Sequence, residues 1–134
     1  MKLFLKKNAF SPIIKDGEIL YIPNFKKKNE ADLLLKKLED SIPWRQDKIT
    51  VYGKIYDQPR LTSLHSIQQK PYTYSNITMQ PRAMTNELLQ ILAEIEHIKP
   101  NSYNSVLLNL YRNGKDSNGW HADNESALVI NPSI

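Results

Sequence analysis

The sequence predicts an α+β domain in which helices back a sheet, and two observations indicate this class. Apolar residues recur at helical spacing after Asn29 and throughout 85–100, whereas apolar and polar residues alternate in 103–112. A period of 3.6 residues is typical of an amphipathic helix, and a period of two is typical of a strand. Because further short strand-like segments lie between the helical ones, we expect the helices to pack on a sheet.

The first half of the chain contains a short strand, a helix and a hairpin. The strand is expected over 18–22, after a turn. The helix begins with Asn29 as its N-cap and is ended by Pro43, because proline cannot continue a helix. Its apolar stripe consists of Leu34, Leu35 and Leu38. Residues 48–56 then indicate a hairpin whose bend contains Gly53.

The second half begins with the clearest helix and continues into a strand. The helix covers 85–100 and places His97 in its last turn, where we expect it at the surface. Its apolar face consists of Leu88, Ile91, Leu92, Ile95 and Ile98. One side of the strand at 103–112 consists of Val106, Leu108 and Leu110. Asn109 and Tyr111 point to the other side, which brings two polar side chains together in an apolar strand.

Length and composition indicate one small globular domain. The chain has 134 residues, of which 40% are hydrophobic and 24% are charged, values typical of a folded domain. It contains no cysteine, which excludes disulfides, thiolate metal sites and a cysteine nucleophile. No segment is long and apolar enough for a signal peptide or a bilayer-spanning helix. We therefore expect a cytoplasmic or nuclear protein that has no membrane partner.

Positive charge is concentrated in the first part of the chain. Residues 1–60 contain 13 Lys and Arg against 8 Asp and Glu, whereas residues 61–134 contain 5 against 6. A basic half could bind a polyanion such as nucleic acid. A solvated lysine-rich surface explains the same excess, and the charge alone favours this second interpretation. The lysine run at 26–28 fits it, because a helix start follows at once.

The segment YRNGKDSNGWHADNE, residues 111–125, contains the strongest candidate for a metal site. In an extended segment, residues two positions apart project to the same side, so His121 and Asp123 can converge. An imidazole and a carboxylate are two of the three ligands of the facial triad that binds non-haem Fe(II). A His-x-Asp pair is common by chance, however, and taken alone it favours a surface histidine beside a loop aspartate.

The surroundings of this pair resemble the AlkB family of Fe(II)- and 2-oxoglutarate-dependent dioxygenases. The resemblance covers residues 17–134 and is carried, in the order of the family, by PNF, IPWRQD, VYGK, QPRLT, YTYSNIT, NSVLLNLYRNGKDSNGWHADNE and INP. It is most similar to the members that repair alkylated DNA. It implies a double-stranded β-helix (jelly-roll) core backed by helices, and oxidative demethylation of alkylated bases in DNA.

The resemblance also implies roles for four residues of the candidate site. His121 and Asp123 are expected to be the catalytic iron ligands. Asn109 and Tyr111 are expected to hydrogen-bond the co-substrate 2-oxoglutarate, which would explain why both lie on one side of a strand.

A second group of residues would contact the nucleic acid. By resemblance, Tyr52 at the hairpin bend would fill the gap left by a flipped base, an aromatic or apolar wedge being a known way to hold opened DNA. Tyr72, Tyr74 and Ser75 would form a lid over the target base, and Glu125 would read its exocyclic amino group. Without the resemblance, we would interpret Tyr52 as a half-exposed aromatic residue of a hairpin. Tyr72, Tyr74 and Ser75 would be ordinary residues of a strand.

The resemblance places the second iron-binding histidine and the arginines for 2-oxoglutarate after INP, which begins at Ile130. We therefore expect residues 1–134 to be one apparently truncated dioxygenase domain that lacks the last core strands. Its 1–100 part would hold the helices and recognition hairpins, and 101–134 the first core strands. We expect a monomer when complete, and His65 to be a loop residue. The alternatives are a dioxygenase acting on RNA and a non-catalytic nucleic-acid-binding remnant.

Overall fold

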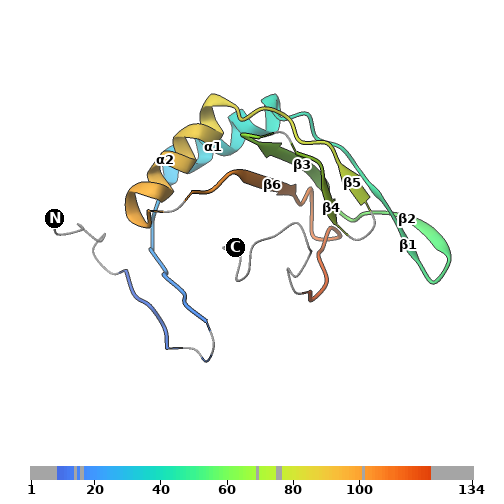
Figure 1. Ribbon diagram of the computed structural model, residues 1–134, viewed down its shortest axis with the longest axis horizontal. Coiled ribbons are helices and arrows are strands. Elements are labelled where there is room, and N and C mark those ends of the chain that lie inside the picture. Colours follow the sequence, from blue (N-terminus) through green and yellow to red (C-terminus); the bar gives the residue numbers. More distant parts are fainter. Residues whose placement is uncertain are drawn as a thin grey trace. The chain divides into compact units, whose positions relative to one another are not determined.

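The computed structural model describes residues 9–13, 15, 17–68, 70–74, 77–100 and 102–121 (Figure 1). The chain forms two compact units, one of residues 1–41 with 86–102 and one of residues 42–85 with 103–134. The described elements are helices and small antiparallel sheets, as the α+β prediction requires. None of the helices in these ranges is long and apolar enough to cross a membrane.

The first unit begins its regular structure with helix α1, Lys28–Ser41. The first helical hydrogen bond runs from the Ala31 N–H to the Lys27 carbonyl, so Lys27 is the N-cap, two residues before the predicted Asn29. The Glu30 carboxylate accepts a hydrogen bond from the Lys27 N–H at 3.3 Å, which is one half of a capping box. The prediction of Asn29 as the N-cap was wrong, because the Glu30 side chain caps the backbone of Lys27 and the helix starts there.

Helix α2, Asn86–Ile98, confirms the predicted second helix. Leu88 on its predicted apolar face is buried, and His97 in its last turn is exposed as expected. Glu94 in the middle of this helix forms an ion pair with Lys26, and Lys99 just after it pairs with Glu18 at 2.9 Å. These two pairs connect the segment before α1 to α2.

The expected strand at 18–22 is reduced to a single bridge in the described part of the first unit. Phe10 and Tyr21 pair antiparallel through two backbone hydrogen bonds of 3.0 and 2.9 Å, and their rings lie 5.1 Å apart. Both rings are about half exposed. An alternating segment without a longer partner strand therefore forms only a local aromatic contact.

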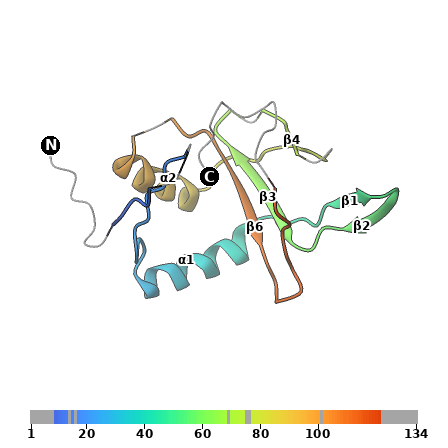
Figure 2. The same cartoon turned by 90° about the horizontal axis from the view of Figure 1, so that it is seen from below.

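The centre of the second unit is the antiparallel pair of β3, Leu61–Ser66, and β6, Ser105–Leu110 (Figure 2). Leu61 lies opposite Leu110 and Ser66 opposite Ser105. The other edge of β3 is also hydrogen-bonded, because Arg45 exchanges two backbone bonds with Thr62. Arg82 bonds in turn to the backbone of both Leu64 and Ser66 on the same edge. β3 is consequently paired along both edges.

The pairing of β3 overturns one prediction, because His65 lies in this strand and not in a loop. The ring is only 2% exposed and bonds to the Ala83 carbonyl at 2.7 Å and to the Ser63 hydroxyl at 3.1 Å. Since both ring nitrogens have protein partners, His65 is a satisfied core histidine. The error arose because Leu-Thr-Ser-Leu-His-Ser shows no strand-like alternation.

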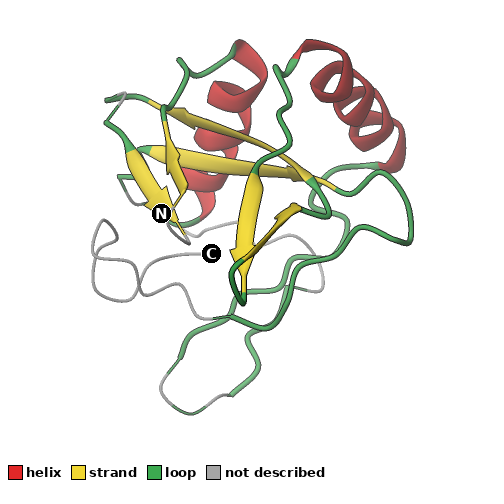
Figure 3. Ribbon diagram, turned by 90° about the vertical axis from the view of Figure 1, so that its right-hand side faces the viewer, coloured by secondary structure: helices red, strands yellow, loops and turns green. Residues whose placement is uncertain are grey.

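Two hairpins complete the second unit (Figure 3). β1, Lys48–Val51, pairs with β2, Lys54–Asp57, which confirms the predicted hairpin and its bend. β4, Tyr72–Tyr74, pairs with β5, Ile77–Met79. With β3 and β6, the described strands make three two-stranded sheets, so the jelly-roll core stays a prediction.

Candidate metal and co-substrate site

Strand β6 positions the two residues predicted to bind 2-oxoglutarate. Asn109 lies opposite the buried Thr62 of β3, and it is exposed while its neighbours Leu108 and Leu110 are half-buried. Tyr111 follows directly after the end of β6 and is 46% exposed. The strand therefore presents an amide and a phenol close together along the chain, on side chains that remain accessible in the described part of the molecule.

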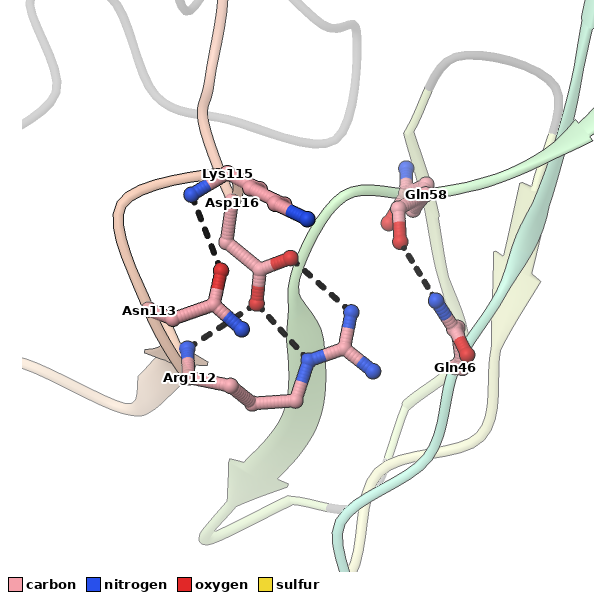
Figure 4. A network of polar contacts seen from close by, with 6 residues as sticks. All are labelled: Gln46, Gln58, Arg112, Asn113, Lys115 and Asp116. Carbon is pink, nitrogen blue, oxygen red and sulfur yellow. Dashed lines mark hydrogen bonds and ion pairs between the residues drawn. The ribbon is translucent and has the colours of Figure 1, made fainter.

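The loop after β6 is closed by an arginine–aspartate clamp, drawn in Figure 4. Arg112 donates its backbone N–H and its Nε to Asp116 Oδ2 at 2.9 and 2.8 Å, and its Nη2 to Oδ1 at 2.9 Å. The Asp116 side chain is only 6% exposed. The side-chain hydrogen bond from Arg112, helped by the backbone one, lowers the pKa of Asp116 to about 2. The carboxylate is therefore ionised at any physiological pH.

Within the clamp, a smaller turn fixes the tip of the loop. The Asn113 side-chain oxygen accepts a hydrogen bond from the Lys115 N–H at 2.9 Å (Figure 4). The Asn113 carbonyl accepts a second one from the Asp116 N–H at 3.1 Å. Asparagine often bonds to the backbone two residues on, which is why it is favoured in turns. The loop is thus stabilised by the turn at Asn113 as well as by the Arg112–Asp116 clamp that closes it.

The end of the same loop is attached to the segment that leads into β3. The Ser117 N–H donates to the Pro59 carbonyl at 2.8 Å, and Arg60 Nη1 donates to Asn118 Oδ1 at 2.9 Å. Arg60 is only 5% exposed, and its Nε is buried without a hydrogen-bond partner in the described residues. The loop before His121 is therefore anchored on a buried part of the second unit.

Beside β3, a buried aspartate holds the segment that precedes the β1–β2 hairpin. Asp47 accepts hydrogen bonds from the Arg45 guanidinium and, at 2.9 Å, from the Thr62 hydroxyl. The Gln46 amide donates to the Gln58 carbonyl at 2.9 Å, across the base of the hairpin (Figure 4). The hairpin consequently projects from a base that is fixed by polar contacts.

His121 ends the described chain in an orientation that suits a metal ligand. Its Nδ1 lies 2.8 Å from the Gly119 carbonyl oxygen. A carbonyl oxygen can only accept, so Nδ1 carries the proton, and the neutral ring then has its lone pair on Nε2. Metal-binding histidines commonly donate from one ring nitrogen to a carbonyl and bind through the other. The residue type and its tautomer therefore fit an iron ligand.

The remaining predicted site residues are described only in part. Asp123, Glu125 and Ser75 lie outside the described residues, and Tyr72 and Tyr74 are described only as backbone in β4. Accordingly, no group of three or more possible metal ligands is found in the part of the chain that the structure covers.

Tyr52, the last predicted site residue, lies at the tip of the β1–β2 hairpin and is fully exposed. Its φ is 49° and that of Gly53 is 75°. Two positive φ values in a two-residue bend match a type I′ turn, which suits the twist of a hairpin. The left-handed conformation is costly for a tyrosine, because its Cβ crowds the backbone. The hairpin therefore presents an aromatic ring to solvent on a strained tip.

Three residues that shape this site were not predicted: Arg60, Asp116 and Asn118. The four-residue spacing of Arg112 and Asp116 within a turn-rich segment is a signal that could have indicated their pairing. The contact of Arg60 with Asn118 joins residues 58 positions apart, and no local pattern could have indicated it.

Comparison with known proteins identifies the class of this fold and site. The family model of the 2OG-Fe(II) oxygenase superfamily matches residues 18–134, and the chain belongs to this superfamily. Within it, the chain is an AlkB-family protein, as the sequence motifs predicted.

The relatives place the chain near two groups of AlkB proteins. It is 42% identical over 127 residues to the human alpha-ketoglutarate-dependent dioxygenase alkB homolog 3 and covers 43% of that protein. It is 32% identical over 128 residues to the DNA oxidative demethylase ALKBH2 of Arabidopsis thaliana and covers 39% of it. These matches include 94% and 88% of this chain. The chain thus spans about two fifths of the length of these relatives.

Proposed function

We propose that the protein is an Fe(II)- and 2-oxoglutarate-dependent dioxygenase that demethylates alkylated bases in DNA. The observation that carries the proposal is the hydrogen bond between His121 and Gly119, which sets the metal-binding tautomer at the His-x-Asp motif of an AlkB-family chain. We also propose a single jelly-roll domain that acts as a monomer.

In this proposal His121 and Asp123 would hold the iron, which with O₂ and 2-oxoglutarate would supply the oxidation of an N-methyl group that leaves as formaldehyde. The Nδ1–H of His121 donates to the Gly119 carbonyl, which fixes the ring plane and leaves Nε2 as the nitrogen for the metal. Asp123 contributes a carboxylate from two positions along the chain. The two ligand types match those of non-haem Fe(II) oxygenases.

Asn109 and Tyr111 would bind the 2-oxoglutarate carboxylate. The Asn109 amide and the Tyr111 hydroxyl are donors, and hydrogen bonds to a charged acceptor are stronger than those between neutral groups. β6 carries Asn109, and β3 supports β6 along its whole length. A rigid strand under the donors reduces the entropy that is lost when the co-substrate binds.

The hairpins would recognise the damaged base. Tyr52 would insert into the gap that a flipped base leaves, because it is fully exposed on a projecting ribbon. Tyr72, Tyr74 and Ser75 would cover the flipped base, and Glu125 would accept a hydrogen bond from its exocyclic amino group. A lesion that weakens base pairing lowers the cost of flipping, which favours damaged over normal bases.

Two other functions remain as outcomes of the test. The same chemistry could act on RNA, and the chain could belong to a nucleic-acid-binding protein without turnover. The name of the ALKBH2 relatives, DNA oxidative demethylase, supports DNA as the substrate class.

The test uses the complete gene product with iron, 2-oxoglutarate and ascorbate, and it measures formaldehyde released from methylated DNA and RNA oligonucleotides. We expect release from DNA that is abolished in His121→Ala and retained in His97→Ala, a control at the exposed end of α2. Faster release from RNA would establish the RNA alternative. Binding without release from either oligonucleotide would establish the non-catalytic one.

A further inference from the structure

A chain of contacts leads from a buried arginine to the ring of His121. Arg60 Nη1 donates to Asn118 Oδ1 at 2.9 Å, and the next residue, Gly119, supplies the carbonyl that accepts from His121 Nδ1 at 2.8 Å. The Ser117 N–H donates to the Pro59 carbonyl at 2.8 Å beside this contact. Pro59 and Arg60, just before β3, therefore hold Ser117 and Asn118, which lie shortly before His121.

The contacts that Arg60 makes with the described residues do not offset the cost of burying its side chain. It is only 5% exposed, it forms no ion pair with the described residues, and its buried Nε has no partner among them. A buried guanidinium that is not neutralised costs free energy, and an apolar side chain would avoid this cost. Its one described hydrogen bond is the one to Asn118.

The position of the Gly119 carbonyl matters because it sets both the tautomer and the direction of the His121 ring. Gly119 has no side chain that could anchor it, and a Cβ at this position would meet no atom within 4 Å. Its backbone is therefore positioned by its neighbours, of which Ser117 and Asn118 are the two that are tied to the start of β3.

From these contacts we propose that Arg60 is a positioning residue for the metal site, acting through Asn118 and the Gly119 carbonyl on the ring of His121. It touches neither metal nor substrate in this role. The proposal rests on the proposed function, because it takes His121 as a ligand. Partners that orient a metal-binding histidine typically contribute about 10- to 100-fold in metal affinity.

The test measures Co(II) binding to the complete gene product by calorimetry, in the absence of substrate. Asn118→Ala removes the acceptor from an exposed side chain, and Asn118→Asp keeps an acceptor for Arg60. We expect Asn118→Ala to weaken Co(II) binding about 10-fold or more at an unchanged melting temperature, and Asn118→Asp to restore it. Asn113→Ala is the matched control, since it removes a hydrogen bond of the same loop that is not on this path.

A double variant tests whether Arg60 acts through Asn118. If it does, the double variant Arg60→Met, Asn118→Ala loses no more Co(II) affinity than the single variant with the larger loss. Additive losses, unchanged affinity in Asn118→Ala, or an equal loss in Asn113→Ala would each overturn the proposal. His121→Ala separates this failure from that of the proposed function. Unchanged Co(II) binding in His121→Ala refutes both, whereas its loss together with normal binding in Asn118→Ala refutes the positioning role alone.

Discussion

At the scale of single residues, the accessible face of β6 is the part of the site that binding experiments can test most directly. Asn109 is exposed on a strand whose other members are mostly half-buried, and Tyr111 follows immediately. A polar side chain in this position adds nothing to the core, so its replacement should change binding and leave folding unaffected.

Asn109→Ala and Tyr111→Phe should each weaken 2-oxoglutarate binding by about 1.5–3 kcal/mol, the range of a hydrogen bond to a charged group. Iron affinity should stay unchanged, because neither side chain is a proposed ligand. Titration of 2-oxoglutarate into the metal-loaded complete gene product measures the effect. Wild-type affinity in both variants would show that this side of β6 does not face the co-substrate.

The histidines show where reasoning from single residues succeeds and where it fails. His97 is exposed as expected, because a helix end is a local feature. His65 was misjudged, because its burial depends on the pairing of β3 with β6, which joins segments about 40 residues apart along the chain. A residue whose environment is made by distant segments cannot be assigned from its neighbours in sequence.

At the scale of elements, the β1–β2 hairpin combines an exposed aromatic tip with a fixed base. Tyr52→Ala should reduce demethylation of duplex DNA much more than that of single-stranded DNA, because only the duplex has a gap to fill. Ile55→Ala, which removes another exposed side chain of the same hairpin, is the control and should have little effect. Initial rates on paired single- and double-stranded oligonucleotides measure the difference. Equal losses on both substrates in Tyr52→Ala would leave the tyrosine a structural turn residue.

The Arg112–Asp116 clamp gives the loop a predictable pH dependence. The pKa of Asp116 is lowered from 3.8 to about 2, so the clamp stabilises the loop fully above pH 3.8 and is lost only as the pH falls towards 2. Arg112→Ala should move the titration midpoint of Asp116 back towards 3.8, as followed by the chemical shift of its carboxyl carbon. A midpoint that remains near 2 would mean that another group stabilises the carboxylate.

The elements themselves were predicted to different degrees. Both helices and the first hairpin follow from local periodicity and turn residues, and the structure confirms them. The strand at 18–22 shortened to one bridge, and β3 was not recognised, because its polar residues obscure any alternation. Thr62, His65 and Ser66 of β3 are stable in the core because their side chains form hydrogen bonds with segments that are remote in sequence.

At the scale of the whole molecule, the concentration of positive charge in residues 1–60 is partly used internally. Lys26 forms an ion pair with Glu94, and Lys28 forms one with Asp32. These contacts support the interpretation that the lysine run at 26–28 is a solvated, paired surface. A charge excess along the sequence therefore does not locate a nucleic-acid interface.

Replacing Lys26, Lys27 and Lys28 together by alanine should consequently leave the affinity for methylated DNA within about twofold and the salt dependence unchanged. Each lysine that contacts a phosphate contributes close to one unit to the slope of log affinity against log salt. Fluorescence anisotropy at several salt concentrations measures this slope. A decrease of about two or three units would place the lysine run on the DNA.

The candidate site was predictable as a set of residues but not as an arrangement. His121 and Asn109 were predicted from spacing, strand alternation and family motifs, and all of these are properties of short segments. The contacts of Arg60 and Ser117 support the loop after β6. They form because this loop packs against the segment before β3, and no local sequence pattern indicates that packing.

The pairing of β3 along both edges has a consequence for how its sheet can be extended. Arg45 and Arg82 already bond to the edge that faces away from β6, so an incoming strand would first have to displace them. In the described residues, β6 pairs with a strand on one side only. Growth of this sheet is therefore directional, because any further strand must add at the other edge of β6, the strand that carries Asn109.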